Sequence, residues 1–309
     1  MSMVATREAY GKTLAELVEE NENIIVLDAD LSGSTKTADA RKARPNQHFN
    51  FGIAEGNMMS AAAGLAASDK VVFASTFAMF AAGRGFEQIR NSIAYPNMNV
   101  KIAATHAGIS LGEDGATHQA IEDISLMRSV PNMTVVSPSD GPETAAAIRA
   151  VAEYVGPVYV RLGRLGVQTI NDNADYKFEL GKGVVLSEGQ DIAIFATGLM
   201  VQEALKAKEI LKAEGLNPTV INIHTIKPID KDLIIETAKT HSLIVTAEEH
   251  NVIGGLGSAV AEVLAVNHPT RMIMVGVNDT FGESGKPADL LAKYGINADN
   301  LAKQILDNK

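Results

Sequence analysis

The sequence predicts an α/β protein of two domains, each a mostly parallel sheet covered by helices. Apolar runs of strand length alternate with helical patterns in two separate series along the 309 residues, which is typical of parallel sheets with helices on both faces. Polar and turn-forming residues separate the two series, and the length suffices for two domains of ordinary size. We therefore expect a first domain over residues 1–170, a linker with a hairpin over 171–190 and a second domain over 191–309.

The elements of the first series begin with an amphipathic helix over residues 6–20. Short apolar runs with helical stretches between them then predict the strands of the first sheet. These runs cover residues 24–28, 71–74, 100–104, 133–136 and 158–161.

The second series alternates in the same way. Its predicted strands cover residues 191–195, 219–223, 243–246 and 272–275, and its predicted helices cover 199–214, 231–239 and 255–266. Both domains therefore belong to the same structural class.

The composition excludes several classes of function. The formal net charge of −10 argues against non-specific binding to nucleic acid or to an acidic membrane surface. The absence of cysteine excludes disulfides, thiolate catalysis and cysteine-based metal sites. No signal-peptide pattern or apolar run of membrane-spanning length occurs, so we expect a cytoplasmic protein.

The densest chemistry lies in one glycine-rich segment after the predicted strand 100–104, which we call the two-histidine loop (residues 104–119). It carries His106 and His118, twelve residues apart, with Glu113 and Asp114 between them. Because imidazole titrates near neutrality, such a pair can hold substrate hydroxyls and transfer their protons. Metal binding is the main alternative, although the spacing matches no standard ligand motif.

Two further segments follow predicted strands or begin a helix. Glu55 precedes a helix of almost entirely small residues, against which a partner helix or a second subunit should pack. Its carboxylate either complements the helix dipole or shares a proton with a ligand nitrogen. Phe77 and Phe80, three residues apart, are either core residues or a platform for a ligand.

Three scattered residues could bind an anion. Arg7 lies in the first turn of the first helix, Ser34 follows the first strand, and Arg164 follows the strand 158–161. Arginine suits phosphate because its planar fork donates two parallel hydrogen bonds. Taken singly, each of these residues is better explained as an exposed arginine or a turn serine.

Together these segments resemble transketolase in residue type, order and spacing. The resemblance spans nearly the whole chain and corresponds to the pyrimidine-binding and C-terminal domains of that family. It rests on Gly52-Ile53-Ala54-Glu55, Thr76-Phe77-Ala78-Met79-Phe80, Thr105-His106, Gly112-Glu113-Asp114-Gly115-Ala116-Thr117-His118-Gln119, Pro131-Asn132-Met133, Pro138-Ser139-Asp140, Ile226-Lys227-Pro228 and Glu248-Glu249-His250.

The resemblance implies a role for each candidate residue. Glu55 matches the catalytic glutamate that bonds the aminopyrimidine of thiamine diphosphate and promotes formation of the nucleophilic ylid. Cofactor-binding positions are also matched by Phe77, Phe80 and Asp30. His106 and His118 match histidines that bind oxygens of the donor sugar and assist proton transfer. The remaining substrate-binding positions are matched by Asp114, which reads a hydroxyl, and by the sugar-phosphate set of Arg7, Ser34 and Arg164.

The chain departs from the family pattern in ways that bear on the pocket. Ala107 replaces a common aspartate, Gly83 replaces a tyrosine, and Glu55 lies between Ala54 and Gly56 instead of arginine and histidine. The Gly-Asp-Gly segment that holds Mg²⁺ and the cofactor diphosphate is absent from the sequence. The resemblance therefore implies the C-terminal subunit of a split transketolase, with an N-terminal subunit supplying the diphosphate and Mg²⁺ site in an assembly of two copies of each chain.

Other interpretations stay open at this point. A 1-deoxyxylulose-5-phosphate synthase usually carries arginine at the position of His106, and a 2-oxo-acid dehydrogenase beta subunit lacks the paired histidine segment. A catalytically silent scaffold subunit is the non-enzyme alternative. In the second domain, Glu248, Glu249 and His250 are interpreted as an interface or a solvated turn and receive no catalytic role.

Overall fold

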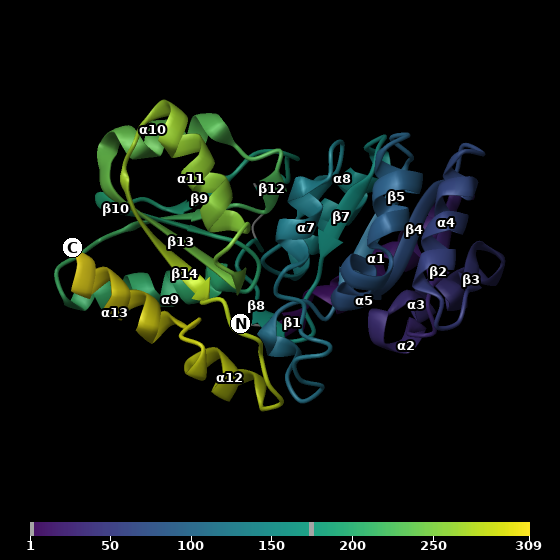
Figure 1. Ribbon diagram of the computed structural model, residues 1–309, viewed down its shortest axis with the longest axis horizontal. Helices are drawn as coiled ribbons and strands as arrows, with labels where there is room; N and C mark the ends of the chain where they lie inside the picture. The colour runs from purple at the N-terminus through teal and green to yellow at the C-terminus, as the bar shows by residue number, and fades with distance from the viewer. Residues whose placement is uncertain (1–2, 173–175) are drawn as a thin grey trace.

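Two sheets organise the chain, and the computed structural model describes them over residues 3–172 and 176–309 (Figure 1). The first sheet has seven strands in the order β12-β6-β7-β5-β4-β2-β3, and the second has five in the order β14-β13-β10-β11-β9. Neighbouring strands are parallel in both sheets except at β12 and β9, which lie antiparallel at the edges. The two-domain α/β architecture predicted from the sequence is confirmed.

All nine predicted strands form. In the first sheet they are β2 (Ile24–Asp28), β4 (Val71–Phe77), β5 (Val100–Thr105), β6 (Thr134–Val136) and β7 (Val158–Arg161). In the second sheet they are β10 (Asp191–Ala196), β11 (Thr219–Asn222), β13 (His241–Asn251) and β14 (Arg271–Val277). The short strands β3 (His48–Asn50), β9 (Val184–Ser187) and β12 (Thr225–Lys227) complete the sheets, and their length left too little pattern to recognise.

Helices cover both faces of the first sheet, as two separate apolar clusters show. One cluster packs α1 (Thr6–Glu20), α3 (Thr37–Ala43) and α8 (Gly141–Glu153) on one face. The other packs α4 (Glu55–Ala66), α5 (Ala78–Arg84), the π-helical turn η2 (Ile89–Ala94) and α7 (Asp123–Ser129) on the opposite face. Short turns connect these elements: α2 (Ser32–Thr35), α6 (Phe86–Gln88), η1 (Pro45–Gln47) and η3 (Ile109–Leu111).

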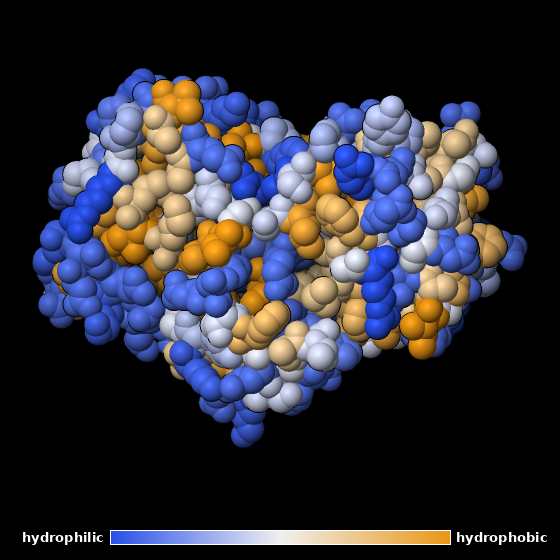
Figure 2. Space-filling view, viewed as in Figure 1, coloured by the Kyte–Doolittle hydropathy of each residue, from blue (hydrophilic) through white to orange (hydrophobic). Residues whose placement is uncertain are grey.

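The second sheet is covered in the same way. Its one face carries α9 (Met200–Ala213), α12 (Pro287–Lys293) and α13 (Ala298–Asn308), and its other face carries α10 (Lys231–Thr240) and α11 (Leu256–Asn267). The space-filling view shows a largely hydrophilic surface over α13 and a notch between the two domains (Figure 2). Arg128, Ile226 and Pro228 from the first-domain side and Ala259 and Val263 of α11 line a groove between the domains.

The predicted hairpin in the segment 171–190 is not formed among the described residues, and this part of the prediction is wrong. The strand β9 instead pairs antiparallel with β11, Val185 lying opposite Ile221. Just before this segment, β8 (Gly166–Gln168) pairs with β1 (Met3–Ala5) at the domain junction. Both strands thus find partners far away in sequence, which a local turn pattern cannot reveal. Residues 173–175 of the predicted linker lie outside the described residues.

One strand crosses between the halves of the chain. Thr225–Lys227 follows the second-domain strand β11, yet it pairs with β6 at the edge of the first sheet, Thr225 opposite Val136. It covers an edge that would otherwise expose unpaired backbone groups. The two domains are therefore joined by a shared sheet edge as well as by the linker. No helix among the described residues is long and apolar enough to cross a membrane.

Candidate active site

The candidate residues meet because parallel strands end at the same edge of a sheet. Asp30 follows β2, Phe77 is the last residue of β4, His106 follows β5, and Arg164 follows β7. These strands are neighbours in the first sheet. Residues separated by more than a hundred positions in sequence are thereby brought to one edge.

His106 is the most constrained of these residues. Its Nε2 lies 3.0 Å from Nη1 of Arg7, and its Nδ1 lies 2.9 Å from the Thr105 hydroxyl. A guanidinium only donates hydrogen bonds, so Nε2 accepts and the ring proton belongs on Nδ1. The backbone of His106 has a left-handed φ of 60°, a conformation that costs a non-glycine residue about 1 kcal/mol.

Burial also sets the ionisation of His106. Burial first, and then the nearby charges of Arg7 and Arg164, lower the pKa of the imidazole to about 3. The expectation that both loop histidines titrate near neutrality does not hold for His106, because its ring is only 3% exposed and faces two cations. At neutral pH it is a neutral hydrogen-bonding group.

An aromatic cluster joins the two histidines. The ring of His106 stacks on Phe77 with a centroid distance of 3.9 Å, and Phe77 stacks on Phe80 at 5.7 Å. The ring of His118 meets Phe80 edge-on at 5.2 Å, and its Nδ1 lies 2.9 Å from the Thr117 hydroxyl. Phe77 and Phe80 are thus part of a wall that both histidines contact, rather than of the core alone.

The predicted anion-binding residues also gather here. Nη1 of Arg7 donates to the backbone carbonyl of Ser34 at 2.9 Å, in addition to its contact with His106. Nη1 of Arg164 donates to the carbonyl of Leu111 at 2.5 Å and to the carboxylate of Glu113 at 3.1 Å. Burial, and then the charge of Arg164 among the nearby groups, lowers the pKa of Arg7. Two guanidinium groups therefore face the same space beside His106.

Asp114 lies on the outer part of the two-histidine loop. It is exposed, between Glu113 and Gly115. The structure therefore keeps it in the same loop as the two histidines without burying it with them.

Glu55 lies near Phe80 of the aromatic wall. It is the first residue of α4 and only 4% exposed, and it accepts a hydrogen bond from Nη1 of Arg84 at 3.0 Å. The guanidinium carbon of Arg84 lies 4.4 Å above the ring of Phe80. An open pocket of about 250 Å³ is lined by Ala29, Asp30, Leu31, Ile53, Glu55, Phe80 and Arg84.

Arg84 was missed by the sequence interpretation. It follows Phe80 by four residues on α5, a spacing that places two side chains on the same face of a helix. That spacing was the available signal. Asp30, by contrast, was identified and lies at the pocket rim, where its carboxylate accepts from the Asn50 side chain at 3.3 Å.

The pocket suits one half of thiamine diphosphate. A buried carboxylate beside an aromatic ring matches a flat, nitrogen-bearing ring such as an aminopyrimidine. Within the described residues, no group of three or more histidine, aspartate or glutamate side chains could hold a metal ion. The residues that could hold an aminopyrimidine are therefore Glu55 and Phe80.

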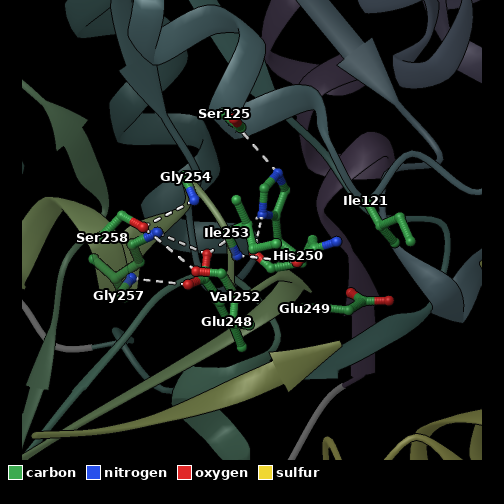
Figure 3. A network of polar contacts seen from close by, with 12 residues as sticks. Ile121, Ser125, Glu248, Glu249, His250, Val252, Ile253, Gly254, Gly257 and Ser258 are labelled. Carbon is green, nitrogen blue, oxygen red and sulfur yellow. Dashed lines mark hydrogen bonds and ion pairs between the residues drawn. The ribbon is translucent and has the colours of Figure 1, made fainter. Parts of the chain in front are cut away.

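The cluster Glu248-Glu249-His250 is not a solvated turn, and that alternative is wrong. All three residues belong to β13 and are at most 5% exposed. Figure 3 shows the carboxylates of Glu248 and Glu249 pointing to opposite sides of the strand. Glu248 accepts from the backbone N–H groups of Leu256 and Gly257 at 2.7 and 2.8 Å, and so caps the N-terminus of α11.

Burial dominates the ionisation of this cluster as well. It raises the pKa of Glu248 to about 7 and lowers that of His250 to about 4. The backbone N–H of Ser125 on α7 lies 3.4 Å from Nε2 of His250, so the cluster reaches the first domain. The interface alternative of the sequence interpretation agrees with this arrangement.

Comparison with known proteins identifies the family. The pyrimidine-binding domain of transketolase matches residues 2–169, and the transketolase C-terminal domain matches residues 181–301. A putative transketolase C-terminal section from Methanocaldococcus jannaschii is 52% identical over 303 residues, which are 97% of this chain and 95% of that protein. A 6-deoxy-6-sulfo-D-fructose transketolase subunit from Clostridium sp. is 40% identical over 297 residues, 96% of this chain and 92% of that protein.

A solved structure gives the same result. The structure of a split-gene transketolase, described as an inactive beta4 tetramer, has a TM-score of 0.92 and 55% sequence identity to this chain and covers 98% of both chains. Fold, site and relatives define a thiamine-diphosphate enzyme of the transketolase type. The chain belongs to the transketolase family, and within it to the C-terminal sections that contain the pyrimidine-binding and C-terminal domains.

Proposed function

We propose that this chain is the C-terminal subunit of a two-chain transketolase. It transfers a two-carbon ketol unit from a ketose phosphate to an aldose phosphate, together with an N-terminal subunit that holds Mg²⁺ and the cofactor diphosphate. The observation that carries the proposal is the shared aromatic wall: Phe80 lines the pocket that contains Glu55, while Phe77 and Phe80 contact His106 and His118, and His106 contacts Arg7. A cofactor pocket and a polar pocket for a sugar phosphate thereby adjoin.

The cofactor side has a simple division of labour in this proposal. Thiamine diphosphate, when bound, would supply a nucleophilic carbon for ketol transfer. Glu55 holds a ring nitrogen of the aminopyrimidine by a hydrogen bond, and Phe77 and Phe80 exclude water from that ring. Asp30 contacts the cofactor from the pocket rim.

The substrate side binds and orients the sugar phosphate. Arg7, Ser34 and Arg164 bind its phosphate, and Asp114 reads one of its hydroxyl groups. His106 and His118 hold the sugar oxygens nearest to the reacting carbon. Because Arg7 donates to Nε2 of His106 at 3.0 Å, that nitrogen takes part in proton transfer only when the guanidinium turns toward a bound phosphate.

The assembly completes the proposal. The open pocket at Glu55 accepts the N-terminal subunit, and two copies of each chain form the active complex. We place the pyrimidine-binding domain at residues 1–170 and the C-terminal domain at 191–309, with the linker between them.

Reconstitution tests this function. This chain, the N-terminal subunit, thiamine diphosphate and Mg²⁺ should together convert a ketose phosphate and an aldose phosphate into the products of ketol transfer. No carbon dioxide should be released, whereas a 1-deoxyxylulose-5-phosphate synthase or a 2-oxo-acid dehydrogenase releases it. A complex that binds the cofactor fully but transfers no ketol unit contradicts the proposal.

A further inference from the structure

The two-histidine loop is held from the second domain. Oε1 of Glu249 on β13 accepts a hydrogen bond from the backbone N–H of Ser110 at 2.5 Å, and both residues are buried. Ser110 is the central residue of η3, four residues after His106. The contact therefore joins a strand of the second domain to the middle of the loop that carries both histidines.

The backbone of the loop is shaped to receive this carboxylate. Gly108 has a φ of 83°, and a Cβ atom on it would lie 2.3 to 2.7 Å from the carboxylate atoms of Glu249. Any residue with a side chain would therefore push Glu249 away. Only glycine at position 108 allows the carboxylate to reach the amide of Ser110.

The second domain makes another contact with the far end of the loop. Nε2 of Gln119 donates to the backbone carbonyl of Glu283 at 3.0 Å and to that of Ile109 within the loop at 3.2 Å. The side chain of Gln119, next to His118, thus ties the far end and the middle of the loop to the segment before α12. Among the described second-domain side chains, Pro287 and Ser284 lie close to Gly112 and Gly115 of the loop, and Glu249 hydrogen-bonds the loop backbone.

The backbone of Glu249 is also held in place. Arg161, at the end of β7, forms a buried ion pair with Asp123 at 2.8 Å and donates to the backbone carbonyl of Glu249 at 2.9 Å. Backbone and side chain of Glu249 are thereby both bonded to the first domain. A residue held in this way transmits the position of β13 to the loop with little freedom of its own.

The neighbouring glutamate supplies a contrast. Glu248 is equally buried but caps α11 within its own domain, and its carboxylate points away from that of Glu249 (Figure 3). Both residues belong to β13, both are buried, and both accept hydrogen bonds from backbone N–H groups. They differ in whether the bond crosses to the two-histidine loop.

We propose that Glu249 is a positioning residue through which the second domain orders the two-histidine loop for substrate binding. Its loss leaves the buried amide of Ser110 without an acceptor, and η3 then opens locally. His106 and His118 lose their common orientation on the aromatic wall. As far as turnover is concerned, the inference rests on the proposed transketolase function.

Hydrogen exchange of the full chain tests the positioning without any activity. Glu249→Ala should raise the exchange rate of backbone amides in peptides covering residues 106–119 by at least about tenfold. Glu249→Gln, which keeps an oxygen acceptor of the same size, should restore most of the protection. Glu248→Ala is the matched control, and it should raise exchange at the start of α11 but leave the loop unchanged.

Kinetics of the reconstituted complex then add the functional consequence. Glu249→Ala should lower kcat/KM for the sugar phosphate by about 10- to 100-fold while half-saturation by thiamine diphosphate stays unchanged. Unchanged loop exchange in Glu249→Ala, or an equal rise in Glu248→Ala, would overturn the inference. If Glu249→Ala does not fold, Glu249→Asp takes its place, because its shorter side chain cannot reach Ser110. Loop exchange as slow as in the wild type would then overturn the inference. An inactive wild-type complex contradicts only the proposed function, because the exchange measurement stands alone.

Discussion

The two sides of the candidate site differ in how far this chain completes them. On the histidine side, His106 is buried and bonded to Arg7 and Thr105, and the second domain holds the loop through Glu249. On the cofactor side, the pocket is open, with Ile53 75% exposed and the Arg84 side chain 55% exposed. The proposed substrate side is thus built within the chain, whereas the proposed cofactor side presents an open surface.

The largest effect is expected on the cofactor side, at Glu55. Glu55→Ala in the reconstituted complex should lower kcat by at least about 100-fold, because the proposed proton exchange with the cofactor needs a carboxyl group at this position. The other carboxylate of the pocket, Asp30, lies at its rim and accepts a hydrogen bond from Asn50. Steady-state kinetics of ketol transfer measure kcat, and equilibrium dialysis measures whether the complex still binds the cofactor. Glu214→Ala, an exposed glutamate outside the site, is the control. Retained turnover in Glu55→Ala would favour the silent scaffold subunit.

On the substrate side, Arg7 should contribute mainly to binding. Arg7→Ala should raise the KM for the sugar phosphate by about 10- to 100-fold, since a charge-assisted hydrogen bond to phosphate is lost. The matched control is Arg271→Ala, an exposed arginine at the start of β14. A fall in kcat with an unchanged KM would show that Arg7 acts on His106 and not on the phosphate.

Acid stability reports the burial of His106. The folded-state pKa of His106 is lowered from 6.5 to about 3, so between these pH values the unfolded chain binds a proton that the folded chain does not. The contribution of His106 to the free energy of unfolding is fully present above pH 6.5 and is lost as the pH falls toward 3.

Removing the imidazole should therefore reduce the acid sensitivity. His106→Asn, which tolerates a left-handed backbone, should lose about 2 kcal/mol less unfolding free energy than the wild type between pH 6.5 and about pH 5. Urea unfolding at several pH values measures this difference. Equal losses in both proteins would mean that His106 titrates normally and that the substrate side is more open than the structure indicates.

The smallest effect is expected at Arg84, on the open side. Arg84→Ala removes a donor that competes with the cofactor for Glu55, and half-exposed ion pairs are weak. We expect the half-saturation concentration of thiamine diphosphate to fall by about two- to fivefold, measured by equilibrium dialysis of the complex. Weaker cofactor binding would show that Arg84 belongs to the cofactor site itself.

Local patterns carried the fold prediction a long way. Strands such as Ile24–Asp28 are buried on both faces and begin with an unbroken apolar run of four residues, so their positions follow from the local sequence. The strands β9 and β12 are short and lie at sheet edges, where half the backbone groups find no partner within the sheet and side-chain patterning is weak. Their pairing depends on which distant strand needs an edge partner.

The candidate site divides along the same line. Glu55, Phe77, His106 and Arg7 could be selected because their residue types and their positions after strands indicate chemistry. The spacing of Phe80 and Arg84 indicates one helix face, but it does not show that Arg84 meets Glu55, and nothing local shows that Glu249 reaches Ser110 from another domain. Those contacts join residues up to 139 positions apart in sequence, and no local spacing encodes them.

The sequence by itself determined the class of fold, the family and the identity of the candidate residues, because apolar periodicity and residue type act locally along the chain. Only the tertiary structure decided the state of those residues. The two-histidine loop contains a neutral, cation-facing His106 because burial removes the water that would stabilise its charge. Glu248 and Glu249 are adjacent and chemically identical, yet one caps a helix and the other holds the loop, since successive residues of a strand face opposite sides of the sheet.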